Sequence, residues 1–421
     1  MKKQFKIFKG IFIIAIFANL LVSCGYEPVF YGIMHDVVPE SATVSGNIAT
    51  IARCTISSEE YLLVSGGGNL KYKKLSSAKH GEWKNYKNLP FSLHYYNYYP
   101  TSSTPEGHMG QQILRVIADK DNIYLLTANY KTDVDYGIVL PNEFFLWTCP
   151  LADFLNSKKT DWKNIAEGKK SLFPTKYNST DGIFETYFSL FMTNTPNPAH
   201  RKAFFVTFPS TEGTEYYELT ASEMSKIDSI ETRGTFIATN ENNTRRNSAF
   251  YVGDTLYFSD SIAVITNETA TKNATYACIA GANDSYNSTV KLYLYDGNSL
   301  ELHYEAGSTI ASLAITGNSL LIGKGSYTST YTTNGGIERI LLDADGKPLK
   351  EKADFLNNAQ YQFTSHYILM TILCADPTKN EEDACLYTAI TFRGDASSTT
   401  ATFSNIGLWS YYPTRGNWNR E

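Results

Sequence analysis

Short runs of strand-forming residues recur along this chain at intervals of about 50 to 80 residues. Most of these runs follow a similar run across a polar turn, a third run comes after them, and several units have a fourth. Because one four-stranded unit cannot bury both of its faces, such units must stack on one another. The runs that we interpret as second strands cover residues 61–65, 123–128, 203–208, 255–258, 319–323 and 385–392.

The tryptophans fit this repeat. Trp83, Trp162 and Trp418 fall in the fourth run of their units, whereas Trp147 and Trp409 fall in the third. Chance placement of all five tryptophans at two positions of one repeat is improbable. We therefore expect Trp83, Trp162 and Trp418 to occupy equivalent positions and to pack between neighbouring units.

Composition also favours strands over helices. The chain has 30 tyrosines and 23 phenylalanines, and Asn, Ser and Thr are plentiful, which is typical of strands joined by polar turns. The best local candidate for a helix covers residues 220–230. Four short antiparallel strands repeated about six times predict an all-β fold, a β-propeller of about six four-stranded blades, or seven. A pair of β-sandwiches is the alternative.

One stretch also resembles a known family. Residues 313–323 (LAITGNSLLIG), followed by residues 335–348 (GGIERILLDADGKP), resemble a blade of bacterial secreted β-propellers. The resemblance extends over roughly residues 45–421, is specific in two or three units and selects no subfamily. It implies the same propeller fold.

The N-terminal segment has the pattern of a secretory signal. Four lysines and no acidic residue occupy residues 1–9, and an apolar run follows over residues 11–22. That run is too short for a membrane-spanning helix, which needs roughly 20 residues. Leu21, Val22, Ser23 and Cys24 resemble the lipobox of bacterial lipoproteins. The resemblance implies cleavage before Cys24 and diacylation of its thiol; an ordinary signal peptide with a chance cysteine is the alternative.

These observations predict three parts of the chain. Residues 1–23 form a signal peptide that is removed, residues 24–44 form a tether or a ring-closing segment, and residues 45–421 form the propeller domain. We expect the protein in the bacterial cell envelope, periplasmic or on the cell surface, held to the lipid bilayer by acylated Cys24.

Charge argues against a nucleic-acid partner. Removing residues 1–23 takes four of the 37 lysines and arginines and none of the 42 acidic residues, so the formal charge becomes about −9. A mildly negative chain lacks the broad basic surface that binds nucleic acid.

The cysteines have no metal-site spacing. Cys-x-x-Cys is absent, which excludes the usual zinc-ribbon and thioredoxin signatures. Cys374 and Cys385 flank a polar decapeptide between two apolar runs, which indicates a hairpin. We predict a disulfide between them in an oxidising compartment, with buried thiols as the alternative.

Recognisable catalytic signatures are also absent. The seven histidines form neither His-Glu-x-x-His nor His-x-His, and no Gly-x-Ser-x-Gly occurs. We therefore predict no catalytic residue, metal site or cofactor. Paired carboxylates of a glycosidase could be recognised only in space.

Long connections fall mainly on one side of the predicted sheets. Connections longer than about 12–15 residues are usually functional or disordered. The most distinctive of them carries Tyr95, Tyr96, Tyr98 and Tyr99, our candidate ligand contacts, because exposed tyrosines combine large contact area with a hydroxyl group. The alternative is that these rings pack the loop onto the blade edges. The long connections cover residues 88–111, 130–142, 266–288, 326–334 and 394–404.

Together these patterns predict a non-catalytic binding or scaffold lipoprotein that recognises a protein or a glycan through the long-loop face. The alternative is a polysaccharide-active enzyme, a lyase or glycosidase, on the same scaffold. A catalytic propeller should show a central cluster of Asp, Glu, Tyr or Arg, whereas a binding module should show an apolar, aromatic patch.

Overall fold

A computed structural model gives the structure of the protein. Backbone contacts group residues 42–421 into one unit and residues 1–41 into another. Cys24 and the predicted signal peptide lie outside the described residues. The structure describes residues 44, 48, 51–66, 69–75, 83–93, 110–133, 138–178, 183–192, 199, 201–207, 215–227, 248–252, 255–259, 263–267, 274–279, 291–295, 300–305, 309–316, 319–325, 336–344, 346–349, 354–355, 368–374, 385–392, 407–412 and 417–421.

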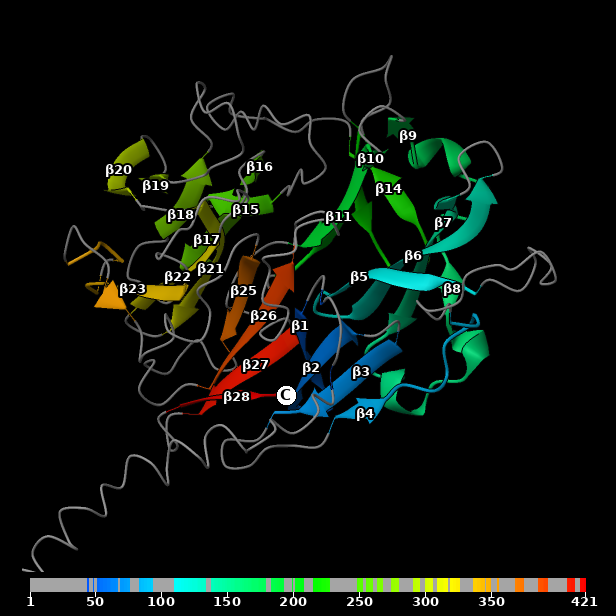
Figure 1. Ribbon diagram of the computed structural model, residues 1–421, viewed down its shortest axis with the longest axis horizontal. Coiled ribbons are helices and arrows are strands. Elements are labelled where there is room, and N and C mark those ends of the chain that lie inside the picture. Colours follow the sequence, from blue (N-terminus) through cyan, green and yellow to red (C-terminus); the bar gives the residue numbers. More distant parts are fainter. Residues whose placement is uncertain are drawn as a thin grey trace, which may run out of the picture. The chain divides into compact units, whose positions relative to one another are not determined.

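The described strands form antiparallel sheets in which each strand pairs with the next one along the chain (Figure 1). The four-stranded sheets are β1 (Ile51–Ile56), β2 (Glu59–Gly66), β3 (Asn69–Lys74) and β4 (Lys84–Asn85); β5 (Gln112–Ala118), β6 (Asn122–Asp133), β7 (Ile138–Pro150) and β8 (Lys163–Asn164); β11 (Phe188–Met192), β12 (Ala203–Thr207), β13 (Glu215–Leu219) and β14 (Met224–Lys226); β17 (Ala263–Asn267), β18 (Ala274–Ile279), β19 (Lys291–Tyr295) and β20 (Leu300–Glu305); β21 (Thr309–Thr316), β22 (Ser319–Gly325), β23 (Gly336–Leu341) and β24 (Asp354–Phe355); and β25 (Ile368–Cys374), β26 (Leu386–Phe392), β27 (Gly407–Tyr412) and β28 (Asn417–Arg420).

Smaller elements complete the described chain. β9 (Thr175–Asn178) pairs with β10 (Ile183–Thr186), and β15 (Ser248–Val252) pairs with β16 (Thr255–Ser259). Short 3-10 turns lie at Phe154–Asn156, Lys159–Asp161 and Lys170–Leu172. No helix among the described residues has the length and apolar character needed to cross a membrane.

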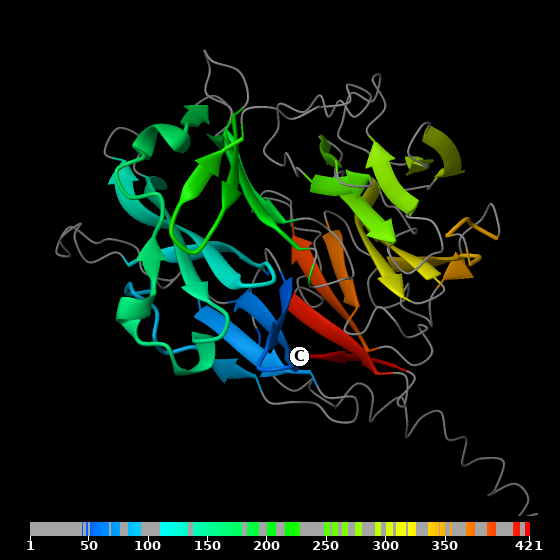
Figure 2. The same ribbon diagram turned by 180° about the vertical axis from the view of Figure 1, so that it is seen from behind.

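Strand β12, the second strand of its sheet, is buried on both faces, which explains its continuous apolar sequence. All five residues of β12 are buried. Because side chains alternate along a strand, Ala203 and Phe205 pack with residues of β5–β8, whereas Phe204 and Val206 pack with Phe191 on the other side. Figure 2 shows this sheet, β11–β14, in green from behind.

Successive sheets contact one another through their first strands. These contacts join β1 to β5, β5 to β11, β11 to β15, β15 to β17, β17 to β21, β21 to β25, and β25 back to β1. Apolar clusters fill the spaces between neighbouring sheets, for example between β1–β4 and β5–β8. Four-stranded meander sheets in contact through their inner strands are the arrangement of a propeller scaffold.

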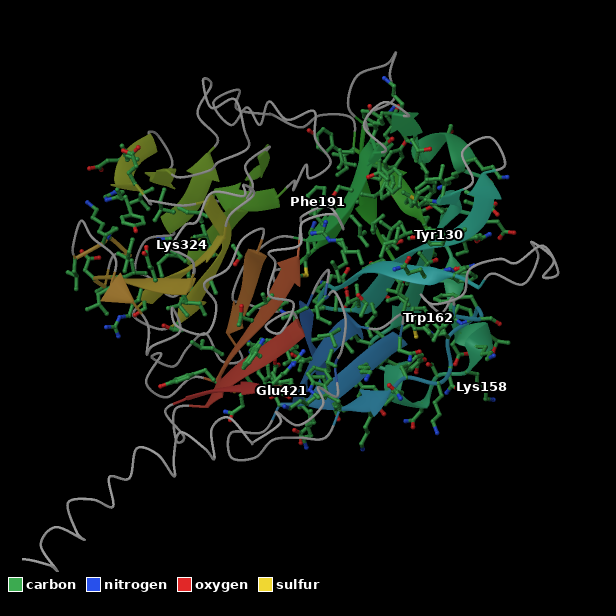
Figure 3. The ribbon with its side chains drawn as sticks, viewed as in Figure 1. Tyr130, Lys158, Trp162, Phe191, Lys324 and Glu421 are labelled. Carbon is green, nitrogen blue, oxygen red and sulfur yellow. The ribbon has the colours of Figure 1, made fainter. Side chains whose placement is uncertain are left out.

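A buried ionic network joins the first and last of these sheets. Lys73 Nζ on β3 lies 2.6 Å from Glu421 Oε2, which also accepts a hydrogen bond of 2.7 Å from Trp83 Nε1. Val44, the last residue of the predicted tether or ring-closing segment, donates its backbone N–H to the Glu421 carbonyl oxygen at 3.2 Å. Figure 3 labels Glu421 beside the strands that it connects.

The predicted second strands are confirmed, and the tryptophans lie where the repeat requires them. The predicted runs coincide with β2, β6, β12, β16, β22 and β26. Trp83 and Trp162 directly precede the fourth strands β4 and β8, and Trp418 lies within β28. Trp147 and Trp409 lie in the third strands β7 and β27. The side chain of Trp162 is 4% exposed.

Two predicted loops contain strands. Residues 266–288 include β18, whose sequence ATYACI carries only three strongly strand-forming residues, so we assigned it to a loop. Because β18 is a strand, β19 is the third strand of the sheet β17–β20. The pair β15–β16 forms a separate described sheet. Residues 130–142 include the ends of β6 and β7, which continue pairing beyond an irregularity at Asn129 and Tyr130. A β-bulge of this kind lets the long hairpin bend without ending.

The candidate helix at residues 220–230 is not helical over residues 220–227, the part that the structure describes. This segment turns from β13 into β14, and Met224 pairs with Leu219. Thr220 Oγ1 accepts hydrogen bonds from the backbone N–H groups of Ser222 and Glu223 at 3.3 and 3.2 Å. Such a local side-chain bond competes with helical hydrogen bonding and favours a turn.

Candidate functional site

The two ends of the tyrosine-rich connection are held together. Leu93 forms a parallel bridge with Gln111, and Gln111 donates its backbone N–H to the Ser92 carbonyl oxygen at 2.7 Å. A Cβ atom on Gly110 would lie 2.3 Å from that same oxygen, so only glycine permits this close approach. We call Phe91–Leu93 and Gly110–Gln111 the loop stem. Tyr95, Tyr96, Tyr98 and Tyr99 lie between its two halves, outside the described residues, and their role stays a prediction.

The sheet that carries the stem is fixed at its opposite end by Asp119. Asp119 Oδ1 accepts hydrogen bonds from the backbone N–H groups of Asp121 and Asn122 at 2.8 and 2.7 Å. The Tyr124 hydroxyl donates to Asp119 Oδ2 at 2.9 Å. Burial raises the pKa of the Asp119 carboxyl, although these hydrogen bonds oppose the rise. This turn fixes the pairing register of β5 and β6. It therefore fixes which residues of β6 and β7 Gln111, just before β5, can reach.

Gln111 links the stem to β6 and β7. Its Oε1 atom accepts hydrogen bonds from Thr127 Oγ1 at 2.6 Å and from Trp147 Nε1 at 3.1 Å. The two bonds orient the amide, and one of them also fixes the indole ring of Trp147. With Oε1 engaged, the amide nitrogen of Gln111 is the end of this side chain that can donate to a ligand.

Three aromatic rings lie beside this amide. The Phe91 and Trp147 ring centroids are 5.8 Å apart, and those of Phe145 and Trp147 are 6.2 Å apart with ring planes 22° from parallel. Phe145 and Trp147 point to the same side of β7 because they are two residues apart. All three rings are partly exposed. We call Phe91, Phe145 and Trp147 the aromatic row.

The side chains of Glu143, Asn129 and Lys170, which we call the polar group, lie beside the aromatic row. Glu143 projects to the same side as Phe145, and its side chain is 35% exposed. Asn129 Nδ2 donates to Glu143 Oε2 at 3.3 Å, while Asn129 Oδ1 is buried and accepts no hydrogen bond. Lys170 Nζ lies 3.5 Å from Glu143 Oε1. Figure 3 labels Tyr130, the neighbour of Asn129 on β6.

The arrangement can therefore bind a ligand by stacking and hydrogen bonding. It offers apolar ring surface from the aromatic row, a donor from Gln111 and an acceptor from the partly exposed Glu143 carboxylate. Within the described chain, no group of three His, Cys, Asp or Glu residues could hold a metal ion. The sequence predicted that Trp147 lies in a third strand. No sequence pattern indicated that Gln111 would form a hydrogen bond with it.

A second polar cluster lies at the inner strand β1. Arg53 Nε is 2.5 Å from Glu60 Oε2, and Thr55 Oγ1 donates to the other oxygen of Glu60. Arg201, which precedes β12, donates from Nη1 to the Arg53 carbonyl oxygen at 2.8 Å. These bonds tie β1 to the sheet that contains β12, and they use the Glu60 carboxylate as a partner for Arg53.

The neighbouring thiol of Cys54 is unreactive in this setting. Burial raises the pKa of Cys54 to about 12; Glu60 adds to the rise, and Arg201 and Arg53 oppose it. A buried thiol that is protonated at neutral pH is neither a nucleophile nor a metal ligand. We therefore assign this cluster a structural role.

The disulfide between Cys374 and Cys385 stays a prediction. Cys374 ends β25, where its backbone pairing partner on β26 is Leu386. Cys385 packs against the cluster formed by Leu62 and Tyr387. The strand register places an apolar residue, not the second cysteine, opposite Cys374.

Comparisons with solved structures give matches of low sequence identity and low TM-score. No protein-family model matches the chain, and no curated protein matches it in sequence. Among solved structures, the chain is similar to Hsv2 of Kluyvelomyces marxianus (TM-score 0.38, 8% identity, 89% of this chain and 96% of the other covered). It is also similar to a lectin of Aleuria aurantia (TM-score 0.35, 6% identity, 90% and 96% covered). An exo-beta-1,3-galactanase of Phanerochaete chrysosporium aligns with a TM-score of 0.30 and 8% identity over 90% of this chain and 71% of the other. We draw no functional conclusion from similarities at this level.

Proposed function

We propose that this protein is a lipid-anchored binding protein of the bacterial cell envelope, with its recognition site at the loop stem of a seven-bladed β-propeller. The closure of the loop stem is the observation that supports a binding site there. Because Ser92–Leu93 and Gly110–Gln111 meet, residues 94–109 leave and return at one place, next to the aromatic row. Binding residues lie disproportionately on loops that a rigid scaffold positions.

The order of contacts supports a count of seven blades. Seven first strands contact one another in sequence, and β25 contacts β1. The pair β15–β16 takes its place in this series between β11 and β17. The Lys73–Glu421 network and the hydrogen bond from Val44 support closure of the ring between the last and first sheets.

The membrane anchor is supported by the sequence Leu21, Val22, Ser23, Cys24 after a basic and apolar segment. Two or more acyl chains give firm membrane attachment, whereas one gives only marginal binding. Replacing the acylated residue, Cys24→Ala, should move the protein from the detergent phase into the soluble fraction. Unchanged detergent partition of this variant would refute the anchor.

The recognition site is tested by replacing Tyr95, Tyr96, Tyr98 and Tyr99 together with serine. This change should abolish partner capture in a pull-down from envelope extract while the melting temperature stays nearly unchanged. Lys159→Ser, in the exposed connection between β7 and β8, is the matched control and should capture normally. A large fall in melting temperature would instead mean that the tyrosine rings pack within the fold.

A further inference from the structure

We infer that the ligand of this site is a neutral glycan whose sugar rings stack on Trp147 and Phe145 and whose hydroxyl groups bond to Gln111 and Glu143. The inference rests on the proposed function, because it names the ligand class of the same site. Each part of it follows from a separate property of the residues beside the loop stem.

The aromatic row supplies a stacking surface that is already in place. The hydrogen bond from Trp147 Nε1 to Gln111 Oε1 restrains the indole, and the Phe91 and Phe145 rings pack against it. The C–H faces of a pyranose are apolar and carry slight positive charge, so they are attracted to the negative face of an aromatic ring. Rings held before binding lose little entropy when a ligand stacks on them.

The polar groups match hydroxyl chemistry. A sugar hydroxyl is both a donor and an acceptor, so its site must offer both functions. Gln111 offers its amide nitrogen as a donor, because its oxygen is engaged by Thr127 and Trp147. Glu143, whose side chain is 35% exposed, offers the acceptor. A carboxylate has about four lone-pair sites, so a sugar hydroxyl can donate to it beside Asn129 and Lys170.

The local charge favours a neutral ligand. Glu143 is the acidic member of the polar group, and its carboxylate is already paired with Asn129 Nδ2 and Lys170 Nζ. The pair leaves little net charge beside the aromatic row. An acidic polysaccharide would require unpaired cationic groups, and the Lys170 ammonium, which is 84% exposed, is screened by solvent.

The test is calorimetric titration of the full mature chain, solubilised in detergent, with four neutral oligosaccharides: cellohexaose, xylohexaose, mannohexaose and laminarihexaose. We expect at least one to bind and to change the tryptophan emission. Trp147→Ala should weaken that binding by about tenfold, the value expected for loss of one stacked ring. Trp147→Phe, which keeps a ring, should restore most of the affinity, and Lys159→Ser should bind normally.

Two further variants keep the test decisive if Trp147→Ala does not fold. Phe145→Ala removes a partly exposed ring, and Gln111→Ala removes the donor; both should weaken binding of the same oligosaccharide. Unchanged affinity in these variants, or absence of binding by all four oligosaccharides, overturns the inference.

The pull-down with the tyrosine variant separates this failure from failure of the proposed function. If no oligosaccharide binds but the tyrosine variant loses a captured protein, the site recognises a protein and only the ligand class is wrong. If neither an oligosaccharide nor a captured protein depends on this site, the recognition site itself is wrong.

Discussion

Replacing Lys73 with methionine should destabilise the protein more than replacing Lys73 and Glu421 together. The Lys73 and Glu421 side chains are 1% and 2% exposed, so both charges are removed from water. Lys73 Nζ also lies 5.5 Å from the centroid of the Trp83 ring and 5.3 Å from that of Tyr387. Methionine keeps most of the lysine stem, and therefore the change removes mainly the charge and its hydrogen bond.

The size of this destabilisation follows from the Glu421 carboxylate, which stays buried when Lys73 is replaced. Breaking a buried ion pair on one side costs about 3–5 kcal/mol, because the other charge is left uncompensated. Unfolding entropy near 2.1 cal/mol/K per residue gives about 0.8 kcal/mol/K for residues 42–421. Lys73→Met should therefore lower the melting temperature by roughly 4–6 °C. Combined with Glu421→Leu it should lower the temperature less, because apolar replacement of a whole pair is often nearly neutral.

Thermal unfolding followed by circular dichroism at pH 7 measures both variants. A melting temperature of Lys73→Met within about 1 °C of the parent would refute the reasoning. So small a change would mean that the ion pair is exposed to solvent and contributes little to stability. A double variant that is less stable than the single one would also refute it.

The same network should make stability depend on pH in one direction. Burial by itself raises the pKa of the Glu421 carboxyl, but the charge of Lys73 and hydrogen bonds from Lys73 and Trp83 outweigh it and hold the pKa below its ordinary value. A carboxyl with a depressed pKa in the folded state stabilises above its unfolded pKa, and this contribution is lost as pH falls through the folded pKa. The stability difference between the parent and Glu421→Gln should therefore shrink as pH falls below about 4.3. A constant difference between pH 7 and pH 3 would contradict this assignment.

Three further changes test other parts of the structure. Gly110→Ala should cost about 1–3 kcal/mol in chemical denaturation, because its Cβ would lie 2.3 Å from the Ser92 carbonyl oxygen; unchanged stability would mean that the stem does not close as described. Trp162→Ala should cost about 3–5 kcal/mol, because this buried side chain packs edge-on against Tyr86, and retention of the parental denaturation midpoint would contradict its place between sheets. Cys54 should not react with a thiol reagent at pH 8 until denaturant is added, since burial raises its pKa to about 12; labelling of Cys54 in the folded protein, located by mass spectrometry, would contradict this.

Much of the strand pattern was predictable because it depends on local alternation and turn chemistry. β21 and β22 illustrate this: Leu313, Ile315, Leu320 and Ile322 alternate into one cluster, and Gly317 and Asn318 connect the strands. β18 was missed because its sequence has weaker alternation, and its assignment depends on pairing with β17 and β19. The turn at Thr220 was missed because a local side-chain bond overrides the helical pattern there.

The candidate site was predictable only in part. The tyrosine-rich loop stood out by its length and composition, and Trp147 stood out by its place in the repeat. The convergence of Gln111, Thr127 and Trp147 depends on the registers of three strands, which no local pattern encodes. The same limit applies to the predicted disulfide, because the sequence of a hairpin does not show which residue pairs with Cys374.

The sequence by itself determined that this chain folds into short stacked strands with tryptophans at their outer positions, since alternation and turn residues act between near neighbours. Tertiary structure decided which distant residues meet. Lys73 reaches Glu421, and Arg201 reaches the backbone of Arg53, only because the sheets return to contact the first strand. Such contacts join residues separated by hundreds of positions, and their partners are selected by strand register and sheet stacking, which exist only in the folded chain.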